Sequence, residues 1–365
     1  MAEQAPTAAD IEAGAGFPPA ERKVVTQSYD LSVETLVEQW DTAQLILPEI
    51  QRESVWDNPR ASRLIESLLL NIPIPVLYFA ETDTAKWEVF DGQQRLRSVV
   101  RFLNNEFRLS TLTVLADHNG NRFHQLPERE QRFLKTRMMR AVVISIDSHP
   151  NMKFEIFERL NTGAIVLNAQ ELRNSLYRGS FNSMLRALAK DNAFRTCIGT
   201  AHPRKRMADE EFLLRFFALR ARLPNYRPPL KKFLNEYMRS VQNADDMALD
   251  DLGQMFRSTV SGIERVWSSS AFKVTDRSGR ATERAPNRAL FDAQMLAFSW
   301  VQDSSEIDQR RAPIVQAFAD LFAEDDFVDS ISLATGDRSR TVLRVSRAAE
   351  ALAAAGVRVD SPEIG

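Results

Sequence analysis

The sequence has one cysteine and four histidines among 365 residues. The single thiol, Cys197, excludes an internal disulfide framework and a cysteine-rich zinc site, so the composition favours the reducing cytoplasm. We expect Cys197 to be inert. The histidines, His118, His124, His149 and His202, are too scattered along the chain to indicate a zinc site.

Long apolar runs are also lacking. No stretch approaches the roughly 18 to 20 apolar residues that span a bilayer, and residues 1–17 have neither the basic start nor the apolar centre of a signal peptide. We therefore expect no membrane partner. Residues 1–24 are interpreted as a disordered tail ahead of an ordered body that begins at about Val25.

A large net charge is lacking too, since 47 basic groups face 49 acidic ones. The balance hides local asymmetry, because residues 92–140 and 201–240 each carry ten Lys or Arg against four Asp or Glu. Either excess suits an anionic partner, and either is equally typical of a solvated basic face.

The first part of the chain predicts a mixed α+β domain. Apolar periodicity and turn residues indicate strands at 27–33, 76–79, 86–90, 111–116 and 141–146, and helices at 34–43, from Asn58-Pro59, from Gln93 and at 126–137. The Asn119-Gly120 pair predicts a hairpin turn after the strand at 111–116.

From residue 150 the pattern is helical almost throughout. Gly163 and Gly179 are expected to close two helices, and Asn168 with Glu171 predicts a capping box between them. Residues 268–286 read as an irregular polar loop. Further helices are expected near 181–191, 208–222, 229–241, 252–268, 287–301, 305–324 and 338–355.

The stretch DGQQR, residues 91–95, lies where an apolar strand passes directly into a helix. A helix start presents unpaired backbone N–H groups and partial positive charge, which together bind phosphate. Gly92 permits close approach to the backbone, Arg95 offers a bidentate fork, and Gln93 and Gln94 add neutral donors. Asp91 repels phosphate unless it holds Mg²⁺ or orients Arg52 or Arg95.

A structural explanation of the same five residues stays open. In it Asp91 caps the helix and Arg95 pairs with Asp91, with no ligand involved. The spacing is neither that of a Walker loop nor that of a dinucleotide-binding fingerprint.

Four ordered blocks carry a family resemblance. They are PEIQRESVW, RLIESLLLNIPIPVLYF, WEVFDGQQRLRSVVRFLNNEF and FEIFERLNTGAIVLNAQELRNSLYRG. Over about residues 30–240 the chain resembles the DGQQR-motif domain at the N-terminus of GmrSD-type, modification-dependent (type IV) restriction proteins. The resemblance implies a fold similar to the ParB/sulfiredoxin class, in which a Gly-x-x-Arg at a helix start holds nucleotide phosphates.

The resemblance also implies roles for individual residues. Asp91, Gln94 and Arg95 match positions tied to NTP hydrolysis, with Asp91 a candidate Mg²⁺ ligand. Nucleotide binding is implied for Gln51, Arg52, Gly92, Gln93 and Asn161. For Asn161 a helix-terminal cap is an equal explanation.

Two further residues match the family's ELRN block, Glu171 and Arg173. An intrahelical or interhelical ion pair explains both without function.

The chain departs from full-length restriction enzymes of this kind. Those carry a C-terminal nuclease of His-Asn-His type, and no histidine follows His202 here. Metal-dependent cleavage needs several converging carboxylates, and near DGQQR the candidates are Asp91, Glu49 and Glu53. Autonomous cleavage of DNA is therefore not expected.

A binding module without turnover is the competing hypothesis. Its duplex-facing cations are Arg204, Lys205, Arg206, Lys231 and Lys232. The interleaved aromatic residues Phe216, Phe217 and Tyr226 lie at helical spacing. This spacing is more typical of core residues than of residues that stack on nucleic-acid bases.

The sequence as a whole predicts an α+β, ParB/sulfiredoxin-like domain at 25–147, a mostly helical domain at 148–356 and a tail at 357–365. The predicted function is a nucleotide-binding sensor of a DNA-modification-dependent restriction or anti-phage system, using GTP or ATP with Mg²⁺. DNA and a separate nuclease subunit are the expected partners, and hydrolysis is left open. Acidic stretches at 245–251 and 324–329 are not assigned a role.

Overall fold

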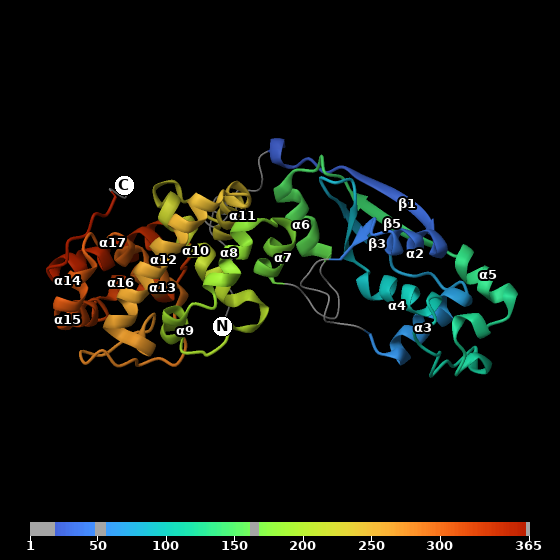
Figure 1. Ribbon diagram of the computed structural model, residues 1–365. Helices are drawn as coiled ribbons and strands as arrows, with labels where there is room; N and C mark the ends of the chain where they lie inside the picture. The colour runs from blue at the N-terminus through green and yellow to red at the C-terminus, as the bar shows by residue number, and fades with distance from the viewer. Residues whose placement is uncertain (1–18, 48–55, 161–167, 363–365) are drawn as a thin grey trace, which may run out of the picture. The chain divides into compact units, whose positions relative to one another are not determined.

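The computed structural model describes residues 19–47, 56–160 and 168–362. It divides into two compact units, residues 17–167 and residues 168–365, which are described separately (Figure 1). The sequence-based assignments for Glu49, Gln51, Arg52, Glu53, Asn161 and Gly163 lie outside the described residues.

A five-stranded mixed sheet forms the centre of the first unit, in the order β1-β5-β3-β4-β2. Antiparallel pairs join β1 to β5 and β3 to β4, whereas β3–β5 and β2–β4 are parallel. The strands are β1 (Thr26–Ser32), β2 (Leu45–Ile46), β3 (Leu77–Glu81), β4 (Trp87–Asp91) and β5 (Met138–Ile144).

Helices cover both faces of β4. Val89 packs into the main core of the unit, and the next residue, Phe90, stacks on Phe157 with ring centroids 3.3 Å apart. Successive side chains of a strand point to opposite faces, so the helix that carries Phe157 lies across the sheet from that core. The helices are α2 (Val33–Asp41), α3 (Asn58–Leu69), α4 (Gln93–Leu103), α5 (Glu128–Thr136) and α6 (Pro150–Leu160), preceded by the short 3-10 turn η1 (Pro19–Glu21).

The predicted α+β class is confirmed, but the strand predicted at 111–116 is wrong. Thr111 has a φ of 59°, which breaks an extended chain. The backbone N–H groups of Val114 and Leu115 donate to Glu66 Oε1 at 2.8 and 2.9 Å. A buried carboxylate on α3 thus replaces the neighbouring strand that the β-propensity of TLTVLA would require, and no hairpin forms.

The second unit is helical and built around one large apolar core. Phe216, Phe217 and Tyr226 are at most 1% exposed, which confirms them as core residues. The helices are α7 (Ala169–Leu176), α8 (Ser180–Leu188), α9 (Asn192–Ile198), α10 (Ala208–Arg222), α11 (Leu230–Val241), α12 (Asp246–Trp267), α13 (Arg288–Ser299), α14 (Ser304–Gln309), α15 (Arg311–Leu321), α16 (Asp325–Ser332) and α17 (Arg338–Ala354).

Several boundaries differ from the sequence-based ones. Helix α12 begins six residues early because Asp245 caps it, its carboxylate accepting from the Ala248 N–H at 2.8 Å. The predicted helix at 305–324 is two helices, α14 and α15, which meet at Arg310. The predicted polar loop at 268–286 contains Ala271 and Phe272, both fully buried.

Gly179 does not close α7, contrary to the prediction. Helix α7 ends at Leu176, and Gly179 has extended backbone ahead of α8. A Cβ at Gly179 would overlap the backbone carbonyl of Gln242. The glycine is therefore required by the close approach of another segment and not by a left-handed helix end.

Candidate functional site

The DGQQR segment forms the junction between β4 and α4. Asp91 is the last residue of β4, and Gly92, with a φ of 93°, is the N-cap residue of α4. A Cβ at Gly92 would overlap the Leu77 side chain and would lie 3.2 Å from Arg95 Nη2. Both the backbone conformation and the space thus require glycine at this turn.

Arg95 is held on three sides. Its Nη2 lies 2.7 Å from Asp91 Oδ2 and also donates to the carbonyl of Val76 at 3.3 Å, and its Nη1 donates to the carbonyl of Pro75. Burial lowers the pKa of Arg95, and the Asp91 charge opposes that shift. The guanidinium stays charged, because arginine is not deprotonated in proteins.

The carboxylate of this pair reaches solvent more than the guanidinium does. The Asp91 side chain is 39% exposed and that of Arg95 11%. Arg95 thus lies beneath the helix start, and Asp91 lies at its rim. The arrangement contains the Asp91–Arg95 pair of the structural explanation, whereas the cap position belongs to Gly92 and not to Asp91.

The second glutamine ties α4 to the residues ahead of α3. Gln94 Oε1 accepts from the Trp56 N–H at 2.9 Å, and Arg101 donates to the Trp56 carbonyl at 3.3 Å and to Asn58 Oδ1 at 3.1 Å. Gln93 is buried. Helix α4 therefore fixes the start of the segment that leads into α3, and Trp56 is the first described residue after Gln51 and Arg52.

The structure brings Asp91, Gly92, Gln93, Gln94 and Arg95 together at one turn. The family's upstream residues, Gln51 and Arg52, and the later Asn161 cannot be placed against them. Within the described ranges, no group of three or more His, Cys, Asp or Glu side chains is arranged to hold a metal ion. A carboxylate oxygen of Asp91 suits Mg²⁺, which keeps water and phosphate oxygens as most of its ligands.

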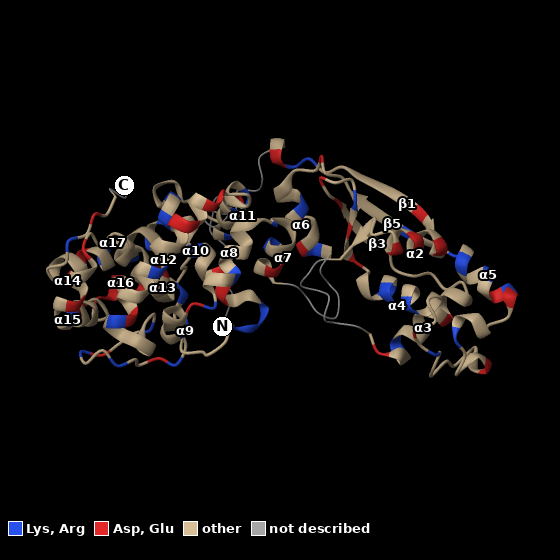
Figure 2. Cartoon of the chain, viewed as in Figure 1, with Lys and Arg blue, Asp and Glu red and all other residues tan. Residues whose placement is uncertain are grey.

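Most of the basic side chains at 92–140 bind other groups of the same unit. Three arginines donate to backbone carbonyls, and two cations form ion pairs with residues of the first strand and helix. These contacts are Arg108 to Gly120, Arg122 to Asn105, Arg137 to Leu68, Arg140 to Asp30 and Lys135 to Glu34. Figure 2 shows basic and acidic residues on the helices of this unit; α4 carries only basic charges, at Arg95, Arg97 and Arg101, and α2 carries only acidic ones.

The second basic stretch is similar. Arg204 Nε lies 2.5 Å from Asp209 Oδ1, Arg206 Nη2 lies 2.9 Å from Glu171 Oε2, and Lys232 Nζ lies 3.8 Å from Glu236. Lys205 is exposed and Lys231 is half-buried. Three of the five predicted nucleic-acid cations are therefore in ion pairs, and Lys205 and Arg206 are exposed.

The ELRN block is structural in its contacts. Asn168 and Glu171 form the predicted capping box, with reciprocal bonds of 2.9 and 2.7 Å. Arg173 is 2% exposed and contacts Asn235 at 2.8 Å and Glu211 at 3.5 Å. The expected ion pairs of Glu171 and Arg173 are confirmed as interhelical, with Arg206 and Glu211 as partners.

The helical unit also contains a buried charge cluster that the sequence analysis did not identify. Arg215 and Arg344 both bind Asp292, with Arg215 Nε 3.0 Å from Oδ1 and Arg344 Nη2 3.0 Å from Oδ2. Asp292 is fully buried, and the arginines are 7% and 1% exposed. The available signal was a charge inside an otherwise apolar helix, as in FLLRFF and ALFDAQMLAF.

Comparison with known proteins adds two findings. Residues 33–178 match the family model described as GmrSD restriction endonuclease, N-terminal domain, which confirms the predicted resemblance over a shorter stretch than residues 30–240. No curated protein matches the chain. Separately, none of the helices that the structure describes is long and apolar enough to cross a bilayer.

Proposed function

We propose that this chain, whose residues 33–178 match the GmrSD restriction endonuclease N-terminal domain, is a nucleotide-binding component of a DNA restriction system. The nucleotide phosphates bind at the start of α4, with GTP or ATP as ligand. The observation that carries the proposal is the junction at Gly92, where a glycine-only turn, a helix N-terminus and a held guanidinium coincide.

Each residue of the junction has a task in this proposal. Gly92 lets a phosphate oxygen approach the backbone of the first helical turn. Arg95, fixed by Asp91 and by the carbonyls of Pro75 and Val76, supplies a charge that needs no reorganisation when the anion arrives. Gln94, anchored to the Trp56 N–H, keeps the turn and the segment ahead of α3 together.

Asp91 would hold Mg²⁺, which supplies charge neutralisation between phosphates when it is bound. The carboxylate is suited to this because it is at the rim of the junction and 39% exposed. Its existing ion pair with Arg95 offsets the repulsion that an isolated carboxylate would exert on the phosphates.

Titration of GTP and ATP against the full chain, with and without Mg²⁺, tests the proposal. Arg95→Ala is expected to lower nucleotide affinity roughly ten- to hundredfold, because a charge-assisted hydrogen bond is worth about 1.5 to 3 kcal/mol. Arg129→Ala is the matched control, since Arg129 is an exposed arginine on α5 of the same unit. Equal affinities of the parent and Arg95→Ala, at matched folded fraction, would overturn the proposal.

Hydrolysis is tested in the same samples by phosphate release, with and without DNA. Turnover in the parent that Asp91→Ala and Arg95→Ala both remove would make the junction an NTPase site. Binding without turnover would leave a nucleotide sensor that does not act as an enzyme.

A DNA-binding module without turnover is the second candidate, favoured by the exposed Lys205 next to Arg204 and Arg206. Cations that contact phosphates release counterions, so DNA affinity should fall steeply with salt. Lys205→Ala is expected to flatten that salt dependence by about one unit of log–log slope. An affinity that is unchanged between low and moderate salt would exclude this candidate.

A further inference from the structure

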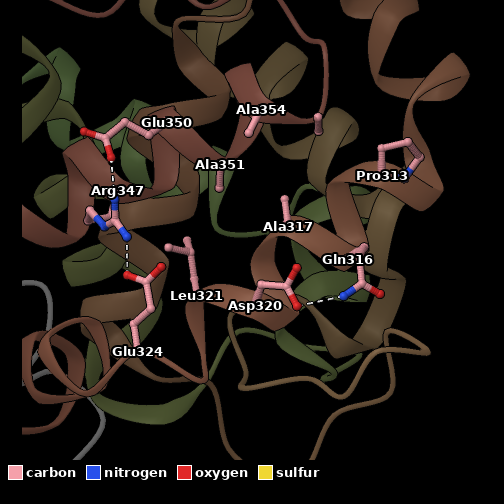
Figure 3. Close-up of a pocket in the computed structure, with 11 residues that line it drawn as sticks. Pro313, Gln316, Ala317, Asp320, Leu321, Glu324, Arg347, Glu350, Ala351 and Ala354 are labelled. Carbon is pink, nitrogen blue, oxygen red and sulfur yellow. Dashed lines mark hydrogen bonds and ion pairs between the residues drawn. The ribbon is translucent and has the colours of Figure 1, made fainter.

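Helices α15 and α17 enclose a groove of about 460 Å³ on the helical unit (Figure 3). It lies in the part of the chain that the family model does not match. Neither the junction at Gly92 nor the charge cluster at Asp292 contributes a residue to its lining.

Small apolar side chains form the middle of the groove. Ala317 and Leu321 come from α15, and Ala351 and Ala354 come from α17, with Ala355 just beyond that helix. Figure 3 shows Ala317, Ala351 and Ala354 between two groups of polar side chains. Small residues let a helix backbone approach closely, so the shape suits a further α-helix laid against α15 and α17.

Polar side chains stand on both sides of these alanines and bind one another. On one side Gln316 Nε2 donates to Asp320 Oδ1 at 2.8 Å. On the other, Arg347 pairs with Glu324 and, at 2.8 Å, with Glu350. Polar groups therefore flank an apolar floor, which is the anatomy of a protein-docking surface.

The surface around the groove is acidic. Three carboxylates line it, those of Asp320, Glu324 and Glu350, against the single guanidinium of Arg347. Arg277 adds one cation, 3.3 Å from Asp320.

Acidic residues continue along the chain from Glu324 into α16, where the stretch EDDFVD adds three further exposed carboxylates. They belong to Asp325, Asp326 and Asp329. Together with the carboxylates of the groove, they give this part of the helical unit an excess of negative charge, which favours a cationic partner over DNA.

The chain's own first 18 residues do not have the complementary charge. They carry three acidic residues and no Lys or Arg. The occupant that fits the groove therefore comes from another molecule.

We propose that the α15–α17 groove docks a cationic amphipathic α-helix of a partner protein. The partner's small or aliphatic stripe packs on Ala317, Ala351 and Ala354. Its Lys or Arg residues pair with Glu324, Glu350 and the acidic start of α16. The proposal is independent of nucleotide binding at the Gly92 junction.

The first probe is a synthetic helical peptide of about 16 residues, long enough to be helical in a groove. It has an Ala/Leu stripe at i, i+4, i+7 spacing flanked by lysines, and its twin has glutamates in place of the lysines. Fluorescence anisotropy with the full chain is expected to show binding of the lysine peptide only, weakened by salt.

Two neighbouring alanines on α17 provide a matched pair of variants. Ala353 and Ala354 are both exposed, but only Ala354 lines the groove. Ala354→Arg is expected to weaken peptide binding at least tenfold, equivalent to about 1.4 kcal/mol, and Ala353→Arg to leave it within twofold. The arginine fills the groove in the first variant and points away from it in the second.

Three results of the peptide experiment would overturn the proposal. The lysine peptide does not bind, or it binds equally to Ala353→Arg and Ala354→Arg, or the glutamate peptide binds as tightly as the lysine peptide. Sedimentation of the chain alone is measured in parallel. A dimer that Ala354→Arg dissociates and Ala353→Arg does not would assign the groove to a second copy and overturn the partner helix.

Discussion

Asp91 and Arg95 are four residues apart in the sequence, on either side of Gly92, and Asp91 Oδ2 lies 2.7 Å from Arg95 Nη2. Because Arg95 is the more buried of the two, Asp91 is its counter-charge as well as a candidate metal ligand. A substitution at either residue therefore also changes the surroundings of the other. Their coupling is the first quantity to measure.

Asp91→Asn separates the two roles of the carboxylate. Removing the negative charge should raise nucleotide affinity without Mg²⁺ by about fivefold, since a charge pair near a surface is worth about 1 to 4 kcal/mol before screening. The same variant should lose the Mg²⁺ dependence of binding. Calorimetric titration with and without Mg²⁺ measures both, and an affinity that still depends on Mg²⁺ would remove Asp91 as a ligand.

Gly92→Ala should lower the free energy of unfolding more than Gly120→Ala does. Both glycines have positive φ, 93° and 88°, so both variants carry the backbone cost of about 1 to 2 kcal/mol. Only Gly92 also meets the Leu77 side chain, since a Cβ at Gly120 has nothing within 4 Å. The difference between the two variants in the free energy of urea unfolding measures the cost of the overlap with Leu77. Equal decreases would show that the Leu77 side chain moves aside at no measurable cost.

Asp292→Ala should destabilise the helical unit by about 3 to 5 kcal/mol, because it leaves Arg215 and Arg344 buried without a counter-charge. Asp308→Ala is the control. The side chains of Asp308 and of its partner Arg265 are 58% and 37% exposed, so losing this pair should lower the free energy of unfolding by at most about 1 kcal/mol. Thermal unfolding of both variants checks the contrast, which would vanish if water entered the Asp292 cluster.

Stability should fall as the pH rises above 10, partly through Tyr177. Burial raises the pKa of Tyr177 from 10.0 to about 12. Between these values the unfolded chain ionises and the folded chain keeps its proton, so the folded state loses about 1.4 kcal/mol of stability per pH unit from this group. Below pH 10 the contribution of Tyr177 to the stability of the folded state is fully present.

Tyr177→Phe provides the comparison. The Tyr177 hydroxyl is buried, and within the part of the chain that the structure describes it has no hydrogen-bond partner, so its loss breaks no bond. Unfolding free energies measured from pH 9 to 12 should diverge in favour of the variant above pH 10. Parallel curves would mean that Tyr177 ionises in the folded state at its ordinary pKa.

The sequence predicted the elements whose signals are local. The stripe of Leu96, Val99, Val100 and Leu103 identified α4, and Asn168 with Glu171 identified the start of α7. Both depend on residues three or four positions apart, within one helix turn. The pairing of Asp91 with Arg95 belongs to the same group.

The features that the sequence did not predict depend on contacts between segments far apart in the chain. Glu66 accepts from Val114 and Leu115, 48 and 49 residues away, and thereby prevents a strand that propensity favours. The carbonyls of Pro75 and Val76 hold Arg95 only because β3 begins beside α4. Propensity and periodicity carry no information on such partners, and neither predicts which charges are buried around Asp292.

The capping box of α7 has an effect beyond its own helix. Asn168 also donates to the carbonyl of Arg206, at 2.7 Å, and Glu171 binds the Arg206 guanidinium. Arg206 and Met207 both have positive φ and are held in that conformation ahead of α10. We therefore expect the start of α7 and the entry to α10 to open as one cooperative unit, with backbone amides that exchange with solvent at a common rate.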